Sequence, residues 1–275
     1  MKIEMKKGLE INQIHQGNSA ELLKQIGDNS IDLTVTSPPY DNLRDYKGYS
    51  FDFETIAKEL YRVTKDGGVI VWIIGDETKS FCESLSSFKQ AIYFVEKCGF
   101  NLLDTMIYQK KNVPPTYPNI KRYIPSFEYM FVFSKGRPKT FNPINDRPNK
   151  YAGIKKTGDT QRQKDGTTKS VRGYIPKPFG LRFNIWRYDV GKNKDTKDII
   201  AFKHPARFPE ELAKDHIISW SNQGDIVLDP FVGSGTTLKI AQREGRDFIG
   251  IEISKEYVEI AKKRLSQSVL EVRIL

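Results

Sequence analysis

The chain has 275 residues, of which 38% are hydrophobic and 28% charged, and its formal net charge is +10. This composition is ordinary for a folded soluble protein, and no apolar run approaches the ~20 residues that a membrane-spanning helix needs, so no membrane association is expected. The first residues, MKIEMKKGLE, lack the apolar segment of a secretory signal, which favours a cytoplasmic protein. Cys82 and Cys98 are too few for a disulfide framework, and without clustered histidines no metal site is expected.

Outside a basic middle region, the chain alternates predicted strands and helices. Residues 31–36 (IDLTVT) are predicted to form a buried strand, which Pro38 and Pro39 stop because proline cannot donate to a sheet ladder. The next predicted elements are a helix marked by Phe53, Ile56, Leu60 and Val63, a turn at 66–68, a strand at 69–74, a helix marked by Phe88, Ile92 and Val95, and strands at 103–108 and 127–133. After the middle region come a helix at 210–221, a strand at 226–229, a helix at 236–243, a strand at 248–253 and a helix from Ser254 to Leu265. This alternation predicts an α/β fold with a largely parallel sheet covered by helices on both faces.

The middle region holds most of the positive charge. Residues 135–203 contain 18 Lys and Arg against six Asp and no Glu, and aromatic residues stand among the cations. Lys and Arg displace counterions from phosphates, and aromatic rings stack on bases, so this region is predicted to bind a nucleic acid. Its composition also allows a solvated linker, although the aromatic residues argue against that alternative.

A glycine-containing loop follows the predicted strand at 226–229. Residues 229–237 read DPFVGSGTT, so glycines that permit close backbone approach precede a helix start, which favours an anionic group. The motif GxxxxGK[ST] is absent, which excludes a phosphate-binding P-loop. The next strand ends at Glu252, an acid of the kind that holds ribose hydroxyls in dinucleotide-binding folds. The two features together predict a nucleoside site with an anionic tail.

A second loop, Thr36-Ser37-Pro38-Pro39-Tyr40, follows the predicted strand at 31–36. The amino group of cytosine or adenine is a poor nucleophile because its lone pair is delocalised into the ring. A Ser hydroxyl and a backbone carbonyl, held rigid by prolines, can accept hydrogen bonds from both amino hydrogens. The adjacent tyrosine can stack on a base that has been flipped out of the duplex.

These motifs, in this order, resemble the β class of amino-methylating DNA methyltransferases of bacterial restriction-modification systems. The resemblance covers nearly the whole chain outside the basic region, and it includes a segment at 203–210 (KHPARFPE) that borders the methionine moiety in relatives. It implies a Rossmann-like fold with a mostly parallel seven-stranded sheet and S-adenosylmethionine as the cofactor. The implied catalytic residues are Ser37, Pro38, Pro39 and Tyr40. The implied cofactor residues are Asn18, His204, Asp229, Pro230, Phe231, Gly233, Ser234, Gly235, Thr236, Glu252 and Ile253.

The resemblance also implies a division of the chain. Residues 1–134 would be the catalytic half, residues 135–202 an inserted target recognition region, and residues 203–275 the cofactor-binding half. The DNA-contacting residues proposed for the insertion are Arg162, Arg172, Arg182 and Arg187. The implied partner is double-stranded DNA, together with a cognate restriction endonuclease where a system includes one.

The target base is predicted to be cytosine, methylated at N4 by direct transfer, with adenine N6 as the alternative. The resemblance associates Ser at the first catalytic position with cytosine enzymes and Asp with adenine enzymes. Methylation of carbon 5 is disfavoured because neither cysteine follows a proline or lies in such a loop. RNA or protein methylation and a catalytically silent nucleic-acid binder are the remaining alternatives.

Overall fold

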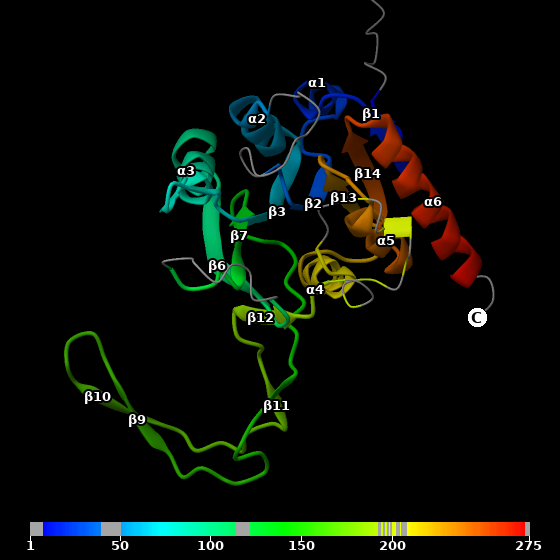
Figure 1. Ribbon diagram of the computed structural model, residues 1–275. Helices are drawn as coiled ribbons and strands as arrows, with labels where there is room; N and C mark the ends of the chain where they lie inside the picture. Colours follow the sequence, from blue (N-terminus) through cyan, green and yellow to red (C-terminus); the bar gives the residue numbers. More distant parts are fainter. Residues whose placement is uncertain are drawn as a thin grey trace, which may run out of the picture. The chain divides into compact units, whose positions relative to one another are not determined.

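The computed structural model describes residues 8–39, 51–113, 122–191, 194, 196, 198, 200–201, 204 and 208–272. The chain forms two compact units (Figure 1). The larger unit consists of Met1–Asn142 and Asn184–Leu275, and the smaller unit consists of Pro143–Phe183.

The larger unit is built on an eight-stranded sheet with the order β1-β14-β13-β2-β3-β7-β6-β12. Its strands are β1 (Gln13–Gln16), β2 (Ile31–Thr36), β3 (Thr64–Ile74), β6 (Asn101–Lys110), β7 (Phe127–Ser134), β12 (Ile185–Tyr188), β13 (Ile226–Asp229) and β14 (Asp247–Glu252). Strand β7 is antiparallel to both neighbours, and the other neighbouring pairs are parallel. The largely parallel sheet is therefore confirmed. The sheet has eight strands instead of the expected seven, because β12, from the basic stretch, adds to the edge of β6.

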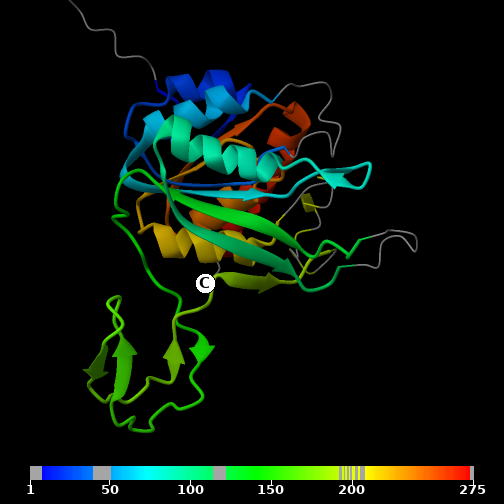
Figure 2. The same cartoon turned by 90° about the vertical axis from the view of Figure 1, so that its left-hand side faces the viewer.

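Helices cover both faces of this sheet, as predicted (Figure 2). Helices α1 (Ser19–Leu22), α2 (Phe53–Val63) and α3 (Ser86–Tyr93) lie on one face, and α4 (Glu210–Trp220), α5 (Thr236–Arg243) and α6 (Lys255–Val272) lie on the other. A 3-10 turn at Leu23–Gln25 follows α1, and a π-helical turn at Phe94–Cys98 follows α3. A small ribbon, β4 (Thr78–Lys79) with β5 (Cys82–Glu83), precedes α3. None of the described helices has the length and apolar character that crossing a bilayer would require.

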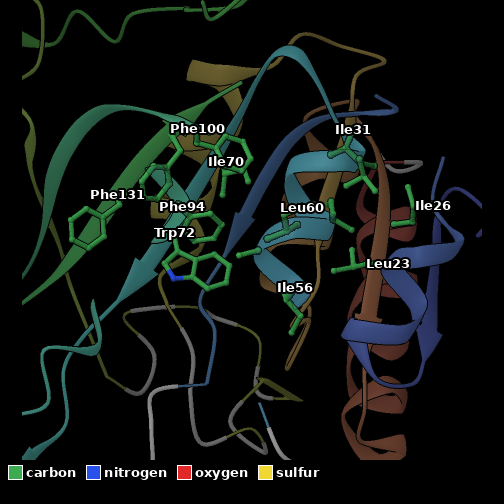
Figure 3. Close-up of a cluster of buried hydrophobic side chains, with 14 of the residues drawn as sticks. Leu23, Ile26, Ile31, Ile56, Leu60, Ile70, Trp72, Phe94, Phe100 and Phe131 are labelled. Atoms are coloured by element: carbon green, nitrogen blue, oxygen red, sulfur yellow. The ribbon is translucent and has the colours of Figure 1, made fainter. Parts of the chain in front are cut away.

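The main hydrophobic core lies between the sheet and the α1–α3 layer (Figure 3). Leu60 of α2, Trp72 of β3 and Phe94 after α3 are fully buried in it. The indole nitrogen of Trp72 donates to Gln90 Oε1 at 2.8 Å, so the polar atom of the ring is satisfied inside the core. This packing fixes β2 and β3, and with them the position of the loop that follows β2.

Most predicted elements occur at the expected places, with two informative differences. The predicted turn at 66–68 lies inside β3, where the pairing with β2 shifts register and Gly67 has φ +82°. The helix predicted from Phe88, Ile92 and Val95 exists, but these three side chains are exposed. The buried face of α3 instead contains Ser87 and Gln90, because their polar groups bond to Asp76 and Trp72.

The smaller unit contains two antiparallel ribbons. Strand β8 (Arg147–Pro148) pairs with β11 (Phe179–Gly180), and β9 (Asp159–Arg162) pairs with β10 (Thr168–Val171). This unit is shorter than the region 135–202 that the charge pattern marks, since the flanking parts of that region belong to the larger unit.

Candidate functional site

Four neighbouring parallel strands, β1, β14, β13 and β2, end at the same edge of the sheet. Asn18, Ile253, the loop at 230–235 and Ser37 follow these strands. The carboxyl ends of parallel strands are where open α/β sheets bind ligands. The structure thus brings the predicted nucleoside loop and the Ser37-Pro38-Pro39 segment to one edge. Tyr40 lies outside the described residues.

A buried hydrogen bond joins the two loops. Thr36 Oγ1 donates to Asp229 Oδ1 at 2.7 Å, across 193 residues of sequence. Asp229 Oδ1 also accepts from the backbone N–H of Phe231 at 3.0 Å, and Thr237 Oγ1 donates to the carbonyl of Val35 at 3.1 Å. The end of β2 and the loop after β13 are therefore held as one structure. The sequence motifs did not reveal this role of Thr36.

Burial dominates the ionisation of Asp229. Desolvation raises its pKa to about 6, and the charge of Glu252 acts in the same direction, although hydrogen bonds from Thr36 and from the backbone of Phe231 oppose the shift. Asp229 is therefore a carboxyl group that changes charge close to neutral pH.

The raised pKa predicts a pH effect on stability. The protonated carboxyl stabilises the fold below about pH 4, and this contribution is lost as pH rises through about 6. Asp229→Asn keeps an oxygen acceptor and cannot ionise. Between pH 4 and 7 the free energy of unfolding of the wild type should therefore fall by about 2 kcal/mol relative to the variant, measured by urea unfolding. Parallel pH profiles for the two proteins would contradict this assignment.

Glu252 lies at the end of β14 and organises the adjacent loops. Its side chain accepts from Gly233 N at 2.8 Å and from Ser254 N at 2.8 Å, and its carbonyl accepts from Gly17 N at 2.9 Å. Burial raises the pKa of this carboxyl, and the backbone donors oppose the shift. A carboxylate has about four acceptor positions, so capacity remains to accept a ligand hydroxyl. Asn18 caps α1 by accepting from Ala20 N at 2.9 Å, which leaves its amide N–H₂ for other partners.

Gly233 and His204 face each other across the loop after β13. Gly233 has φ +51°, and a Cβ there would lie 3.0 Å from both Cε1 and Nε2 of the imidazole. The buried His204 ring packs edge-on against Tyr257, with 4.3 Å between centroids. Only a glycine leaves the backbone open at this point.

A buried ionic cluster supports this loop from behind, and sequence reasoning missed it. Arg264 of α6 is fully buried and donates to the Ser234 carbonyl at 2.7 Å, to Asp198 Oδ2 at 2.8 Å and to Glu210 Oε1 at 2.7 Å. Lys239 of α5 donates to Glu210 at 3.1 Å. Burial raises the pKa of Asp198, but the hydrogen bond and charge of Arg264 and the charge of Lys239 more than offset this, and the pKa lies below its usual value. The sequence does contain one sign of this cluster. Arg264 lies one helical turn after Ala261, which places a charged residue on the buried face of α6.

The other predicted cofactor residues lie in or near this loop. The carbonyl of Pro230 accepts from Ser19 Oγ at 2.5 Å, and Phe231 packs against Phe51, with 5.5 Å between ring centroids. Gly235 has φ +83° at the start of α5, followed by the buried Thr236.

The four predicted DNA-contacting arginines are not equivalent. Arg187 lies on β12 in the larger unit and donates to Gln109 Oε1 at 2.6 Å. Arg182 forms a two-nitrogen ion pair with Asp146 in the smaller unit. Arg162 and Arg172 are exposed in or beside the β9–β10 ribbon.

Known proteins share sequence and fold with this chain. A family model described as DNA methylase, N6_N4_Mtase, matches residues 31–263. The orphan methyltransferase M.BamHII of Bacillus amyloliquefaciens is 57% identical over 251 residues, which cover 90% of this chain and 93% of that protein. The cytosine-N4-specific PvuII DNA methyltransferase shares the fold with a TM-score of 0.67 and 22% identity, over 94% of this chain and 87% of that one. A DNA modification methylase of Thermus thermophilus, solved with S-adenosyl-L-methionine, has a TM-score of 0.62 and 26% identity, with 94% of each chain covered. The chain therefore belongs to the N6/N4 DNA methylase family, the S-adenosylmethionine-dependent amino-methyltransferases of restriction-modification systems.

Proposed function

We propose that this chain methylates the N4 amino group of cytosine in double-stranded DNA, with adenine N6 as the alternative target. The observation that supports it most directly is the position of Ser37-Pro38-Pro39 at the end of β2, locked to the Asp229 loop through Thr36. A serine at this position supplies a neutral acceptor for an amino hydrogen. Because the substrate is DNA, the proposed place of action is the cytoplasm.

In this proposal the cofactor lies along the edge formed by β1, β14 and β13. S-adenosylmethionine supplies an activated methyl group on a sulfonium. Glu252 accepts hydrogen bonds from the ribose hydroxyls, and the backbone at Gly233 approaches the ligand closely. Asn18 and Ile253 border the adenine side, and His204 borders the methionine side. The remaining contacts are assigned to Asp229, Pro230, Phe231, Ser234, Gly235 and Thr236.

The target base is held by the loop after β2. Ser37 Oγ and the Pro38 carbonyl accept the two amino hydrogens and orient the nitrogen, Pro39 stiffens the loop, and Tyr40 stacks on the flipped ring. The reaction forms one nitrogen–carbon bond while the carbon–sulfur bond breaks, and one amino proton leaves to solvent. The chain contributes chiefly by positioning, since serine is a weak base.

The recognition part of the proposal assigns target reading to residues 135–202, of which Pro143–Phe183 is the structurally separate portion. Residues 1–134 and 203–275 then form the two halves of the methyltransferase domain.

Mass spectrometry of nucleosides from treated DNA tests this function. Unmethylated duplex DNA is incubated with the protein and the cofactor, digested, and analysed for methylated bases. We expect N4-methylcytosine. N6-methyladenine would establish the alternative, whereas methylation of RNA alone, or no methylation of any polymer, would contradict the proposal.

Gly233→Ala tests the cofactor assignment. A Cβ added at Gly233 would lie 3.0 Å from the His204 ring, and an alanine there would have to adopt a positive φ. The backbone is therefore expected to move away from the position that the cofactor needs. We expect S-adenosylmethionine to bind roughly tenfold more weakly, by isothermal titration calorimetry. Gly224→Ala is the matched control, because Gly224 also has a positive φ, +81°, but has no atom near the added Cβ. If the two variants bind S-adenosylmethionine with equal affinity, the nucleoside part of the cofactor does not bind at Gly233.

A further inference from the structure

The β9–β10 ribbon is one of the two antiparallel ribbons of the smaller unit, and its dimensions fit a groove of DNA. In it, β9 pairs with β10 in a single register, with Arg162 opposite Thr168 and Thr160 opposite Ser170. Lys156 and Tyr174 pair in the same register further from the turn. The major groove of B-DNA, about 12 Å wide, admits a ribbon of this kind, whose strands lie about 4.8 Å apart.

The turn of this ribbon is internally ordered. Gln163 N donates to the Thr167 carbonyl at 2.7 Å, and Gly166 adopts φ +86°. Asp165 Oδ1 accepts from both Thr167 N, at 3.0 Å, and Thr167 Oγ1, at 2.7 Å. The one acidic side chain of the turn is thus used inside the turn.

The two faces of the ribbon differ in chemistry. Cross-strand partners project to the same face, and neighbours along a strand project to opposite faces. One face therefore presents Arg162 together with Thr160, Thr168 and Ser170, and we call it the arginine face. The opposite face presents Gln161, Lys169 and Val171. Arg172 directly follows β10, and the pairing of Lys156 with Tyr174 keeps the same register beyond it, so the alternation is expected to place Arg172 on the side of the arginine face, at the end far from the turn.

Arg162 and Arg172 are the arginines of this unit that other contacts leave available. Arg182 is paired with Asp146, and Arg147 donates to the Leu181 carbonyl at 3.0 Å and lies over the Phe183 ring. Within the described residues, the side chains of Arg162 and Arg172 have no ion pair or hydrogen bond, and both residues are exposed. The unit as a whole has ten Lys and Arg against three Asp and no Glu, which complements a polyanion.

We propose that the β9–β10 ribbon enters the major groove of the substrate with its arginine face toward the base edges. Arg162, next to the turn, reads a guanine through O6 and N7, the pairing that the planar guanidinium favours. Arg172, at the far end of the ribbon, contacts a phosphate at the groove edge. This inference rests on the proposed function, since it names the recognition element of that DNA methyltransferase.

Mapping the methylation sites of matched full-length variants tests this assignment. Wild type, Arg162→Ala, Arg162→Lys and Lys169→Ala are each given a random-sequence duplex library and S-adenosylmethionine, and the modified positions are sequenced. We expect Arg162→Ala and Arg162→Lys to lose preference at one G·C pair and to act roughly 5- to 150-fold more slowly on the wild-type sequence. Lys169→Ala, which changes the opposite face by the same charge, should keep the preference at every position.

Two binding measurements accompany the mapping. If Arg162→Ala methylates no sequence, its affinity is measured for the recognised duplex and for a scrambled duplex. The ratio of the first affinity to the second should be roughly 5- to 150-fold lower than in the wild type. An unchanged ratio overturns the inference. Arg172→Ala should weaken binding to both duplexes alike and make the dependence of log K on log salt shallower by about 1. An unchanged slope overturns the phosphate assignment.

The outcomes separate this inference from the proposed function. A wild-type protein that methylates no DNA overturns the function. A wild-type protein that methylates a defined sequence, with Arg162→Ala retaining every preference or losing one at an A·T pair, overturns the guanine assignment and leaves the function in place.

Discussion

We expect Ser37→Ala to slow methyl transfer by roughly 100-fold while S-adenosylmethionine binding stays nearly unchanged. The proposal assigns the Ser37 hydroxyl to the amino group of the target base, so its loss leaves that nitrogen poorly oriented toward the methyl group. The cofactor contacts are assigned to Asn18, to His204 and to the loops after β13 and β14, and none of them to Ser37. Single-turnover methylation of a DNA duplex measures the first effect, and calorimetric titration with the cofactor measures the second.

Ser30→Ala is the matched control for this experiment. Ser30 immediately precedes β2, at the opposite end from Ser37, and its hydroxyl donates to the Gly27 carbonyl at 2.7 Å. The control should therefore methylate at the wild-type rate. Full activity of Ser37→Ala would show that Ser37 does not orient the base, and a parallel loss of cofactor affinity would show that it belongs to the cofactor site instead.

The parts of the fold that the sequence predicted are those with a strong local pattern. Strand β13 and helix α5 have the predicted bounds because an apolar strand, a glycine loop and a helical repeat follow one another directly. Helix α6 starts after Ser254 as predicted, although it continues past Leu265 to Val272. Each motif directly follows a predicted strand, so its loop was expected at the carboxyl end of that strand. Parallel pairing of the strands brings these loops to one edge of the sheet.

The parts that sequence reasoning missed depend on contacts between distant residues. Strand β12 is only four residues long and lies in a basic stretch, so its pairing with β6 has no local signature. The burial of α3 through Ser87 and Gln90 depends on partners elsewhere in the fold, whereas its apolar residues suggested the opposite face. Likewise, the bond between Thr36 and Asp229 links positions that only the folded sheet makes neighbours.

The ionic cluster around Arg264 is the clearest example of such long-range dependence, and it leads to the largest expected effect on stability. Arg264→Met keeps the apolar volume of the side chain but removes its charge and donors. Asp198 would then keep Lys239, at 3.6 Å, and Glu210 would keep Lys239, at 3.1 Å, and the more distant Arg243, at 3.9 Å. Breaking a buried ionic cluster on one side leaves uncompensated charge, so we expect the free energy of unfolding to fall by about 3–5 kcal/mol in urea titrations near pH 7.

Arg243→Met is the control that separates burial from charge. Arg243 pairs with the same carboxylate, Glu210, but at 3.9 Å and with a side chain that is 43% exposed, so its loss should cost less than about 1 kcal/mol. A pH series tests the cluster a second way.

The pKa of Asp198 is lowered in the folded protein. Its contribution to stability is therefore present above about pH 4 and is lost as pH falls through the pKa of the folded state. Because Arg264 is the main cause of that lowering, the wild type should lose more stability on acidification than Arg264→Met does. Equal losses for Arg264→Met and Arg243→Met at pH 7, or identical acid profiles for wild type and Arg264→Met, would show that the cluster does not hold the loop at Ser234 through charge.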